Sequence, residues 1–188
     1  IRDRVQTWSG KTFAFYPAIK ELTLDLAATS FLGIPWGPEA DKVNKAFVDM
    51  VQASIGVVRR PLPFTAMGRG AKGRAYLVDY FGKMVPERRE GAGEDIFSQI
   101  CRAKDDAGEY LSTEAIVDHM NFLMMAAHDT ITSSVTSMIW MLAKHPEWQD
   151  KLREEMLNVA PAGEGVGHNS LGELEMTEWA FKESLRLV

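Results

Sequence analysis

Apolar residues recur at helical spacing along most of the chain, and this pattern predicts a mainly α protein. Glycine and proline interrupt the pattern, most densely at 33–38 and 61–63. The expected helices cover 1–32, 39–60, 71–89, 112–143 and 173–188, with a short one between 92 and 110. The glycine-rich segment 160–172 predicts a flexible connection before the last helix.

The longest expected helix covers 112–143, which at about 1.5 Å per residue gives roughly 48 Å. Ser112 fits an N-cap position and Pro146 ends the pattern. The run 121–134 is apolar enough to be buried on every side, yet it places an acid, Asp129, next to an alcohol, Thr130. An ionisable group in such a helix is costly unless it is paired or has chemistry to do. This pair is therefore the first candidate functional site.

On a helical wheel, one broad face is shared by Phe122, Ala126, Ser133 and the Asp129–Thr130 pair. Small residues lie where the acid and the alcohol point, beside the larger side chains of Phe122 and Met125. Such a face predicts a groove against which something flat could lie. Close packing against another helix is the alternative interpretation.

The segment Ala126-Ala127-His128-Asp129-Thr130 resembles the oxygen-activating segment of cytochrome P-450 monooxygenases. In that family the central helix usually carries alanine or glycine, glycine, any residue, an acid and threonine, followed by threonine or serine. Here alanine stands at 127, where glycine is commoner, and isoleucine stands at 131, where a second hydroxyl is commoner. Both the acid and the alcohol are retained.

Two further segments resemble the same family in the expected order. Glu183-Ser184-Leu185-Arg186 is similar to the Glu-x-x-Arg helix, and the run 145–155 looks like the helix that precedes it in the family. Three matches in order are much stronger than one. The resemblance covers nearly the whole chain, from about the fourth helix of the family to its Glu-x-x-Arg helix.

This resemblance implies a cytochrome P-450 fold, in which residues 1–188 form a single partial domain without the N-terminal part and the haem-cysteine loop. It implies that Asp129 relays protons and that Thr130 holds the hydrogen-bond network around the bound oxygen. The resemblance also implies two pocket walls: Ala126, Ala127 and Thr130 for the haem, and Phe122, Met125 and Ala126 for the substrate.

The implied cofactor is haem b, with its iron held by a cysteine beyond Val188. The implied reaction inserts one oxygen atom of O₂ into an apolar lipid-, sterol- or terpenoid-like substrate. Electrons from NADPH or NADH would arrive through a ferredoxin or a reductase-type donor. Glu183 and Arg186 would form a buried structural pair, completed by a partner that this chain lacks. We expect the fragment alone to be inactive and Cys101 to be a buried structural thiol.

Composition limits the classes of binding partner and the cellular location that we expect. The chain has 188 residues with 46% hydrophobic content, enough to bury a core, and its net charge of -5 argues against nucleic acid. One cysteine fits a reducing compartment, so we expect a cytoplasmic location. Residues 59–89, however, include eight basic residues and only two acidic ones, together with an apolar loop. This region could contact an anionic membrane surface, although a solvated face is the alternative.

Two other functions are alternatives to the monooxygenase. The apolar interior would suit a non-catalytic lipid- or terpenoid-binding module, or a degenerate remnant that no longer binds haem. Asp105, Asp106 and Glu109 resemble the magnesium-diphosphate clamp of terpene cyclases. Gly108 within that run and the lack of a second metal motif favour a solvated turn. The four histidines lack the spacing of Glu-x-x-His or His-Glu-x-x-His metal sites.

Overall fold

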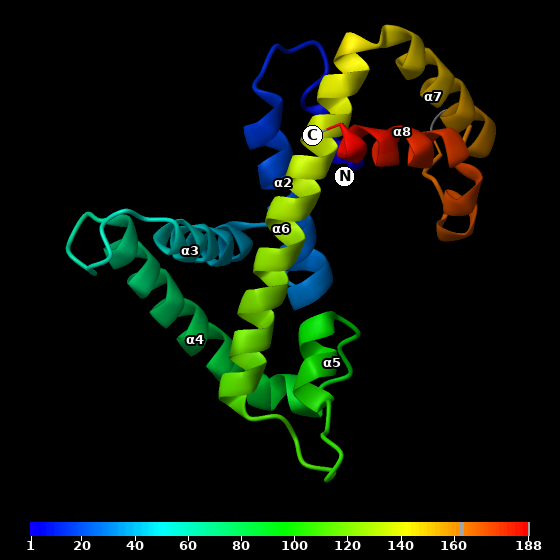
Figure 1. Ribbon diagram of the computed structural model, residues 1–188. Helices are drawn as coiled ribbons and strands as arrows, with labels where there is room; N and C mark the ends of the chain where they lie inside the picture. The colour runs from blue at the N-terminus through cyan, green and yellow to red at the C-terminus, as the bar shows by residue number, and fades with distance from the viewer. Residues whose placement is uncertain (162–163, 188) are drawn as a thin grey trace. The chain divides into compact units, whose positions relative to one another are not determined.

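The computed structural model describes residues 1–161 and 164–187. Its helices are α1 (Arg2–Gln6), α2 (Phe15–Leu32), α3 (Pro38–Ser54), α4 (Ala66–Glu90), α5 (Ile96–Arg102), α6 (Thr113–Lys144), α7 (Pro146–Val159), the 3₁₀ helix η1 (His168–Glu173) and α8 (Glu175–Arg186) (Figure 1). In the described ranges, the only β contact is an isolated bridge between Lys104 and Tyr110. The prediction of a mainly α protein with a long central helix is confirmed. None of the helices in these ranges has the length and hydropathy needed to cross a bilayer.

Two predicted helix boundaries are wrong. The helix expected at 1–32 is interrupted at 7–14, where Gly10 has a φ of 70° and Trp8 packs against Phe13 with ring centroids 5.3 Å apart. A left-handed residue cannot continue a right-handed helix, and glycine adopts that conformation readily. The helix expected at 71 begins at Ala66 instead, because the Thr65 hydroxyl caps it by accepting the backbone N–H of Gly68 at 3.0 Å.

The chain forms two compact units. The first contains residues 1–13 and 20–129, and the second contains 14–19 and 130–188. Helices α2 and α6 each contribute residues to both units.

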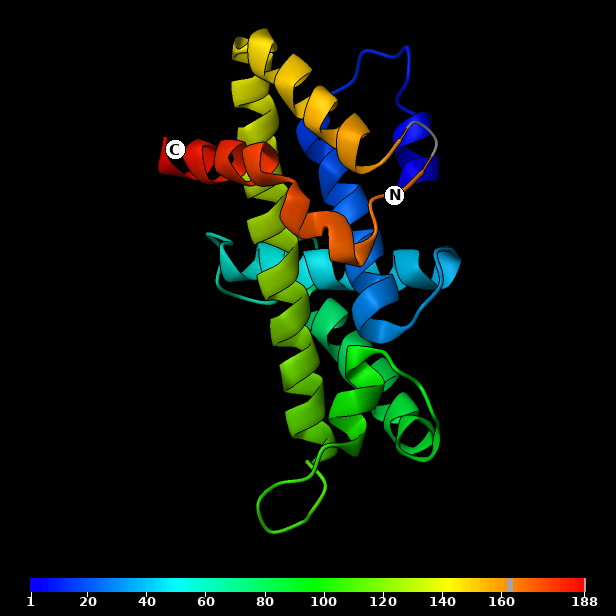
Figure 2. The same cartoon turned by 90° about the vertical axis from the view of Figure 1, so that its right-hand side faces the viewer.

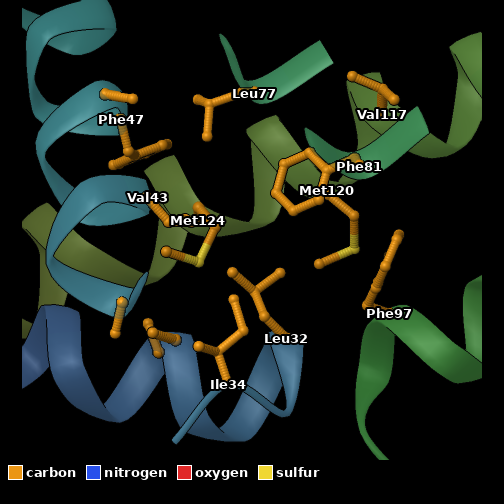
Figure 3. Close-up of a cluster of buried hydrophobic side chains, with 14 of the residues drawn as sticks. Leu32, Ile34, Val43, Phe47, Leu77, Phe81, Phe97, Val117, Met120 and Met124 are labelled. Carbon is orange, nitrogen blue, oxygen red and sulfur yellow. The ribbon is translucent and has the colours of Figure 1, made fainter. Parts of the chain in front are cut away.

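The core of the first unit joins α2, α3, α4, α5 and the first half of α6 (Figure 3). Its largest side chains are each at most 1% exposed: Leu32, Val43, Phe47, Leu77, Phe81, Phe97, Ile116, Met120 and Met124. Burying one such side chain stabilises the fold by about 1.5–3 kcal/mol. The core therefore fixes the stretch of α6 that leads into the candidate site.

Helices α3 and α4 approach each other closely because α4 carries glycine where they meet. A Cβ on Gly70 would lie 2.2 Å from the Cβ of Ala53, and a Cβ on Gly73 would lie 2.4 Å from the carbonyl oxygen of Ala46. Both distances are shorter than non-bonded atoms allow. Glycine is therefore a packing requirement inside this helix, although its intrinsic helix propensity is low.

Arg88, near the end of α4, links three elements of the first unit. Its guanidinium donates to the Asp95 carboxylate at 2.7 Å, to the Ser98 hydroxyl at 2.9 Å and to the Leu32 carbonyl at 3.0 Å. Asp95 also caps α5 by accepting the backbone N–H of Ser98 at 2.9 Å. Burial by itself raises the pKa of Asp95, but the hydrogen bonds from Ser98 and the charge on Arg88 outweigh it and leave the pKa below its usual value.

We expect Asp95→Ala to destabilise the first unit by about 3 kcal/mol, because it strands the largely buried Arg88 guanidinium and removes a helix cap. Since the pKa of Asp95 is lowered by folding, its contribution is present above the usual pKa of an aspartate and is lost as the pH falls through the folded-state value. Urea unfolding at neutral and at acid pH measures both effects.

Asp79→Ala is the matched control for this experiment. Asp79 pairs with Lys83 at 2.6 Å, but the two side chains are 61% and 74% exposed. Such a pair contributes about 0–1 kcal/mol. Equal losses of stability in the two variants would contradict the structural role assigned to Asp95.

In the second unit, Glu155 of α7 caps the first turn of α8. Figure 2 shows the ribbon that leads from α7 through η1 to α8. This residue is 8% exposed, and its carboxylate accepts the backbone N–H groups of Met176 and Thr177 at 2.6 and 2.9 Å. The Thr177 hydroxyl donates to it as well, at 2.6 Å. A negative charge is favourable at a helix N-terminus. This contact fixes the start of the helix that carries Glu183 and Arg186.

Candidate functional site

The predicted site residues of α6 lie on a face that the core leaves open. Phe122 is 61% exposed and Met125 is 41% exposed, and Ala126 is exposed as well. On the other side of the same stretch, Asn121 and Met124 are buried at 9% and 1%. The expectation of a helix buried on every side is therefore wrong, because the core of the first unit packs against one side of α6 only.

Asp129 has an ion-pair partner that the sequence did not reveal. The Nζ of Lys20, on α2, lies 3.8 Å from Oδ1 of Asp129, and both residues belong to the first unit. The Asp129 side chain is 46% exposed. A single lysine far away in the sequence carries no signal of such a contact. The acid is thus partnered and still open to solvent.

Thr130 is the first α6 residue of the second unit and is exposed. Its carbonyl accepts a hydrogen bond from the Ser134 hydroxyl at 2.8 Å, and the carbonyl of Thr132 accepts one from the Thr136 hydroxyl at 2.7 Å. Hydroxyls that return to the carbonyl four residues back are satisfied within the helix. Ser134 and Thr136 therefore have a structural role, and we do not assign them to the site.

Cys101, on α5, lies in the core of the first unit with 0% exposure, so the prediction of a buried cysteine is confirmed. Burial raises the pKa of its thiol. A raised pKa disfavours the thiolate, which is the form that binds iron. Cys101 is therefore not placed to hold a haem.

The described residues contain no side-chain cluster that could hold a metal ion. No three histidine, cysteine, aspartate or glutamate residues among them are placed together for this. The side chain of His128 is outside the described part. Asp105 accepts the backbone N–H groups of Ala107 and Glu109, both at 2.9 Å, and Gly108 has a φ of 83°. This carboxylate closes a turn, in agreement with the solvated turn expected there.

Glu183 and Arg186 form the expected pair on α8. Nε of Arg186 donates to Oε2 of Glu183 at 2.7 Å, and Nη2 donates to Oε1 at 2.6 Å. These hydrogen bonds lower the pKa of Glu183 and raise the pKa of Arg186. The side chains are 54% and 67% exposed, so the described residues of this chain do not provide the burial expected for the pair. On this helix the buried residue is Ser184, one position away.

Glu183 also lines a pocket of about 360 Å³ in the second unit. The lining comes from the end of α6, from α7 and from α8, and includes Met138, Trp148 and Trp179. The sequence did not predict this pocket, because its apolar side chains come from three separate helices. The carboxylate of the Glu183–Arg186 pair is thus placed beside an apolar surface.

Comparison with known proteins identifies the family of this chain. Residues 4–188 match the family model described as Cytochrome P450. Cytochrome P450 136 of Mycobacterium tuberculosis is 43% identical over 180 residues, which cover 94% of this chain and 36% of that protein. Taxane 13-alpha-hydroxylase of Taxus cuspidata is 24% identical over 193 residues, which cover 97% of this chain and 40% of that protein. The chain thus spans two fifths or less of the length of these relatives.

Solved structures show the same fold. The retinoic acid bound cyanobacterial CYP120A1 matches with a TM-score of 0.85 at 24% identity, over 100% of this chain and 43% of that one. The heme domain of cytochrome P450DA matches with a TM-score of 0.84 at 19% identity, over 98% of this chain and 43% of that one. The helices described above therefore correspond to part of a larger, known architecture.

Proposed function

The chain belongs to the cytochrome P450 family, and we propose that the open face of α6 forms the wall of the haem and substrate site of a monooxygenase. The full-length protein would insert one oxygen atom of O₂ into an apolar substrate. Electrons from NADPH or NADH would reach it through a ferredoxin or a reductase-type donor. The family and the fold expected from the sequence motifs are confirmed.

One observation carries the proposal: α6 exposes large apolar side chains and an acid–alcohol pair in the same short stretch. Phe122 and Met125 are exposed, although apolar side chains of this size are normally covered. Between them and Thr130, Ala126 presents only a methyl group, so a planar group can approach the helix backbone. The residues present therefore fit a haem. When bound, haem would supply the iron that activates oxygen, and its cysteine ligand is expected beyond Val188.

The side chains of α6 would then have different roles. Phe122 and Met125 would exclude water and hold the apolar substrate, while Ala126 and Ala127 would form the haem-side wall. The hydroxyl of Thr130 would hold a hydrogen bond that directs a proton to the oxygen being reduced. The carboxylate of Asp129 would carry protons from solvent, in keeping with its exposure of 46%.

A lipid, sterol or terpenoid is the substrate class that this apolar face favours. The name of one relative, a taxane hydroxylase, supports the same class, since taxanes are terpenoids. A non-catalytic lipid- or terpenoid-binding module would use the same face, but it would have no need of an alcohol that directs protons. Mutation of that alcohol therefore separates the two functions.

In the full-length protein with its redox partner, we expect Thr130→Ala to retain haem, substrate binding and NAD(P)H consumption. Product formed per NAD(P)H should fall severalfold while peroxide rises, because protons are no longer directed to the correct oxygen atom. The measurement compares NAD(P)H consumed with product and peroxide formed, using an apolar compound that the protein hydroxylates.

Two variants control for local packing. Thr130→Ser retains a hydroxyl and should recover most of the coupling. Ser133→Ala removes an exposed hydroxyl on the next turn of α6 and should leave coupling unchanged. Unchanged coupling in Thr130→Ala would assign Thr130 a purely structural role in the helix.

A further inference from the structure

Methionine is frequent in this chain, but its side chains are at least partly covered at every position except one. All ten methionines lie in the described ranges, and Met125 of α6 is the exposed one, at 41%. Met124, its immediate neighbour, is 1% exposed and Met120 is 0% exposed. Figure 3 shows both of these side chains within the core of the first unit. The thioether of Met125 is therefore the one most open to a small molecule in solution.

Met125 lies close to the carboxylate that we assign to proton transfer. It precedes Asp129 by four residues, so the two side chains lie one turn apart on the same side of α6. Phe122, three residues before Met125, lies on this side as well and is 61% exposed. A thioether thus stands between the aromatic ring that would hold an apolar substrate and the acid that would serve the bound oxygen.

A thioether reacts directly with hydrogen peroxide. A lone pair of the sulfur attacks one oxygen of the peroxide, an S–O bond forms and the O–O bond breaks. The proton on the transferred oxygen passes to the departing hydroxide, which leaves as water. The sulfur loses two electrons to the peroxide, and the product is methionine sulfoxide, which is polar where the thioether is apolar. Oxidation of Met125 would therefore place a polar oxygen in an apolar wall.

We propose that Met125 is a redox-sensitive residue of the substrate site: peroxide released in uncoupled turnover oxidises it to the sulfoxide, and the sulfoxide weakens binding of the apolar substrate. The inference rests on the proposed function, which supplies both the peroxide and the apolar substrate. Peroxide that forms beside Asp129 meets the thioether of Met125 before it reaches solution, while Met120 and Met124 are shielded by the core. Poor coupling then lowers turnover, and reduction of the sulfoxide restores it.

The first test adds hydrogen peroxide to the full-length, haem-loaded protein without its redox partner, so the result does not depend on turnover. Fragment-ion mass spectrometry distinguishes a sulfoxide at 125 from one at 124. We expect Met125 to be oxidised about tenfold faster than Met124, because exposure governs this reaction. Equal rates would show that another part of the full-length protein covers Met125, and would overturn the proposal.

The second test measures binding of farnesol, an apolar terpenoid, before and after the same treatment. Its dissociation constant should rise by about tenfold, because a polar group against an apolar ligand lacks a hydrogen-bond partner. Methionine sulfoxide reductases should reverse the change, which peroxide damage to the haem would not allow. In Met125→Leu, which has a side chain of similar volume and no sulfur, the dissociation constant should be the same before and after peroxide. An equal rise in this variant would contradict the role of Met125.

The third test follows Met125 during turnover with the redox partner, with catalase present to remove peroxide from solution. Thr130→Ala, which should release more peroxide, should accumulate the sulfoxide at 125 severalfold faster than the unmodified protein. Loss of coupling in Thr130→Ala without oxidation of Met125 would leave the proposed function in place and overturn this inference alone. Unchanged coupling would count against the proposed function, whereas the ratio of oxidation at 125 and 124 by added peroxide would be unaffected.

Discussion

Asp129→Asn in the full-length protein should slow product formation by about 10² to 10⁴-fold, the range for removal of an acid–base group. An amide has a similar shape but cannot give up and regain a proton at neutral pH. Because the side chain is 46% exposed, we expect folding, haem content and substrate binding to be preserved. NAD(P)H consumption should fall together with product. This distinguishes Asp129→Asn from Thr130→Ala, in which consumption continues and coupling is lost.

Lys20→Gln is the matched control for Asp129→Asn. It removes the ion pair between Lys20 and Asp129 but retains the carboxylate. An ion pair with side chains 29% and 46% exposed contributes about 0–1 kcal/mol, so we expect a small effect on stability and rate. If both variants slowed turnover equally, the ion pair would be the important feature, and the proton-transfer role of Asp129 would be wrong.

Arg186→Ala should abolish folded, haem-loaded protein in the full-length chain instead of slowing turnover. The two hydrogen bonds to Glu183 hold both side chains in a fixed fork, and Glu183 lines the apolar pocket between α6, α7 and α8. We propose that the remainder of the longer protein covers this pair. The Glu183 carboxylate, if covered without Arg186, is strongly destabilising, because it can neither form its ion pair nor reach water. Soluble yield and haem per protein chain measure the effect.

Arg153→Ala separates the loss of this pair from the loss of any surface arginine. Arg153 also pairs with an acid three residues away, Asp150, and the two side chains are 61% and 80% exposed. We expect this variant to be soluble and fully loaded with haem. Soluble Arg186→Ala protein with normal haem content would show that the Glu183–Arg186 pair remains exposed in the full-length protein.

The sequence predicted the helices because helix formation depends on neighbours three and four residues apart. The periodic apolar pattern placed α6 within one residue of its ends, Thr113 and Lys144. The Glu183–Arg186 contact was predictable for the same reason, since both side chains lie on one helix. Glycine was harder to interpret: Gly10 lies between two helices with a positive φ, whereas Gly70 lies inside a helix because Ala53 packs against it.

By itself, the sequence thus determined the mainly α class, the long central helix and the stretch that carries the acid and the alcohol. It could not determine which side of that stretch is covered, because the face that the helical wheel singled out could equally form a groove or pack against another helix. Tertiary packing decided this by burying Met124 and leaving Phe122 exposed at 61%. It also placed Lys20 beside Asp129, and it paired most basic residues of α4 while leaving Arg59 and Arg60 exposed in the loop between α3 and α4. These outcomes depend on contacts between residues far apart in the chain, which local periodicity does not encode.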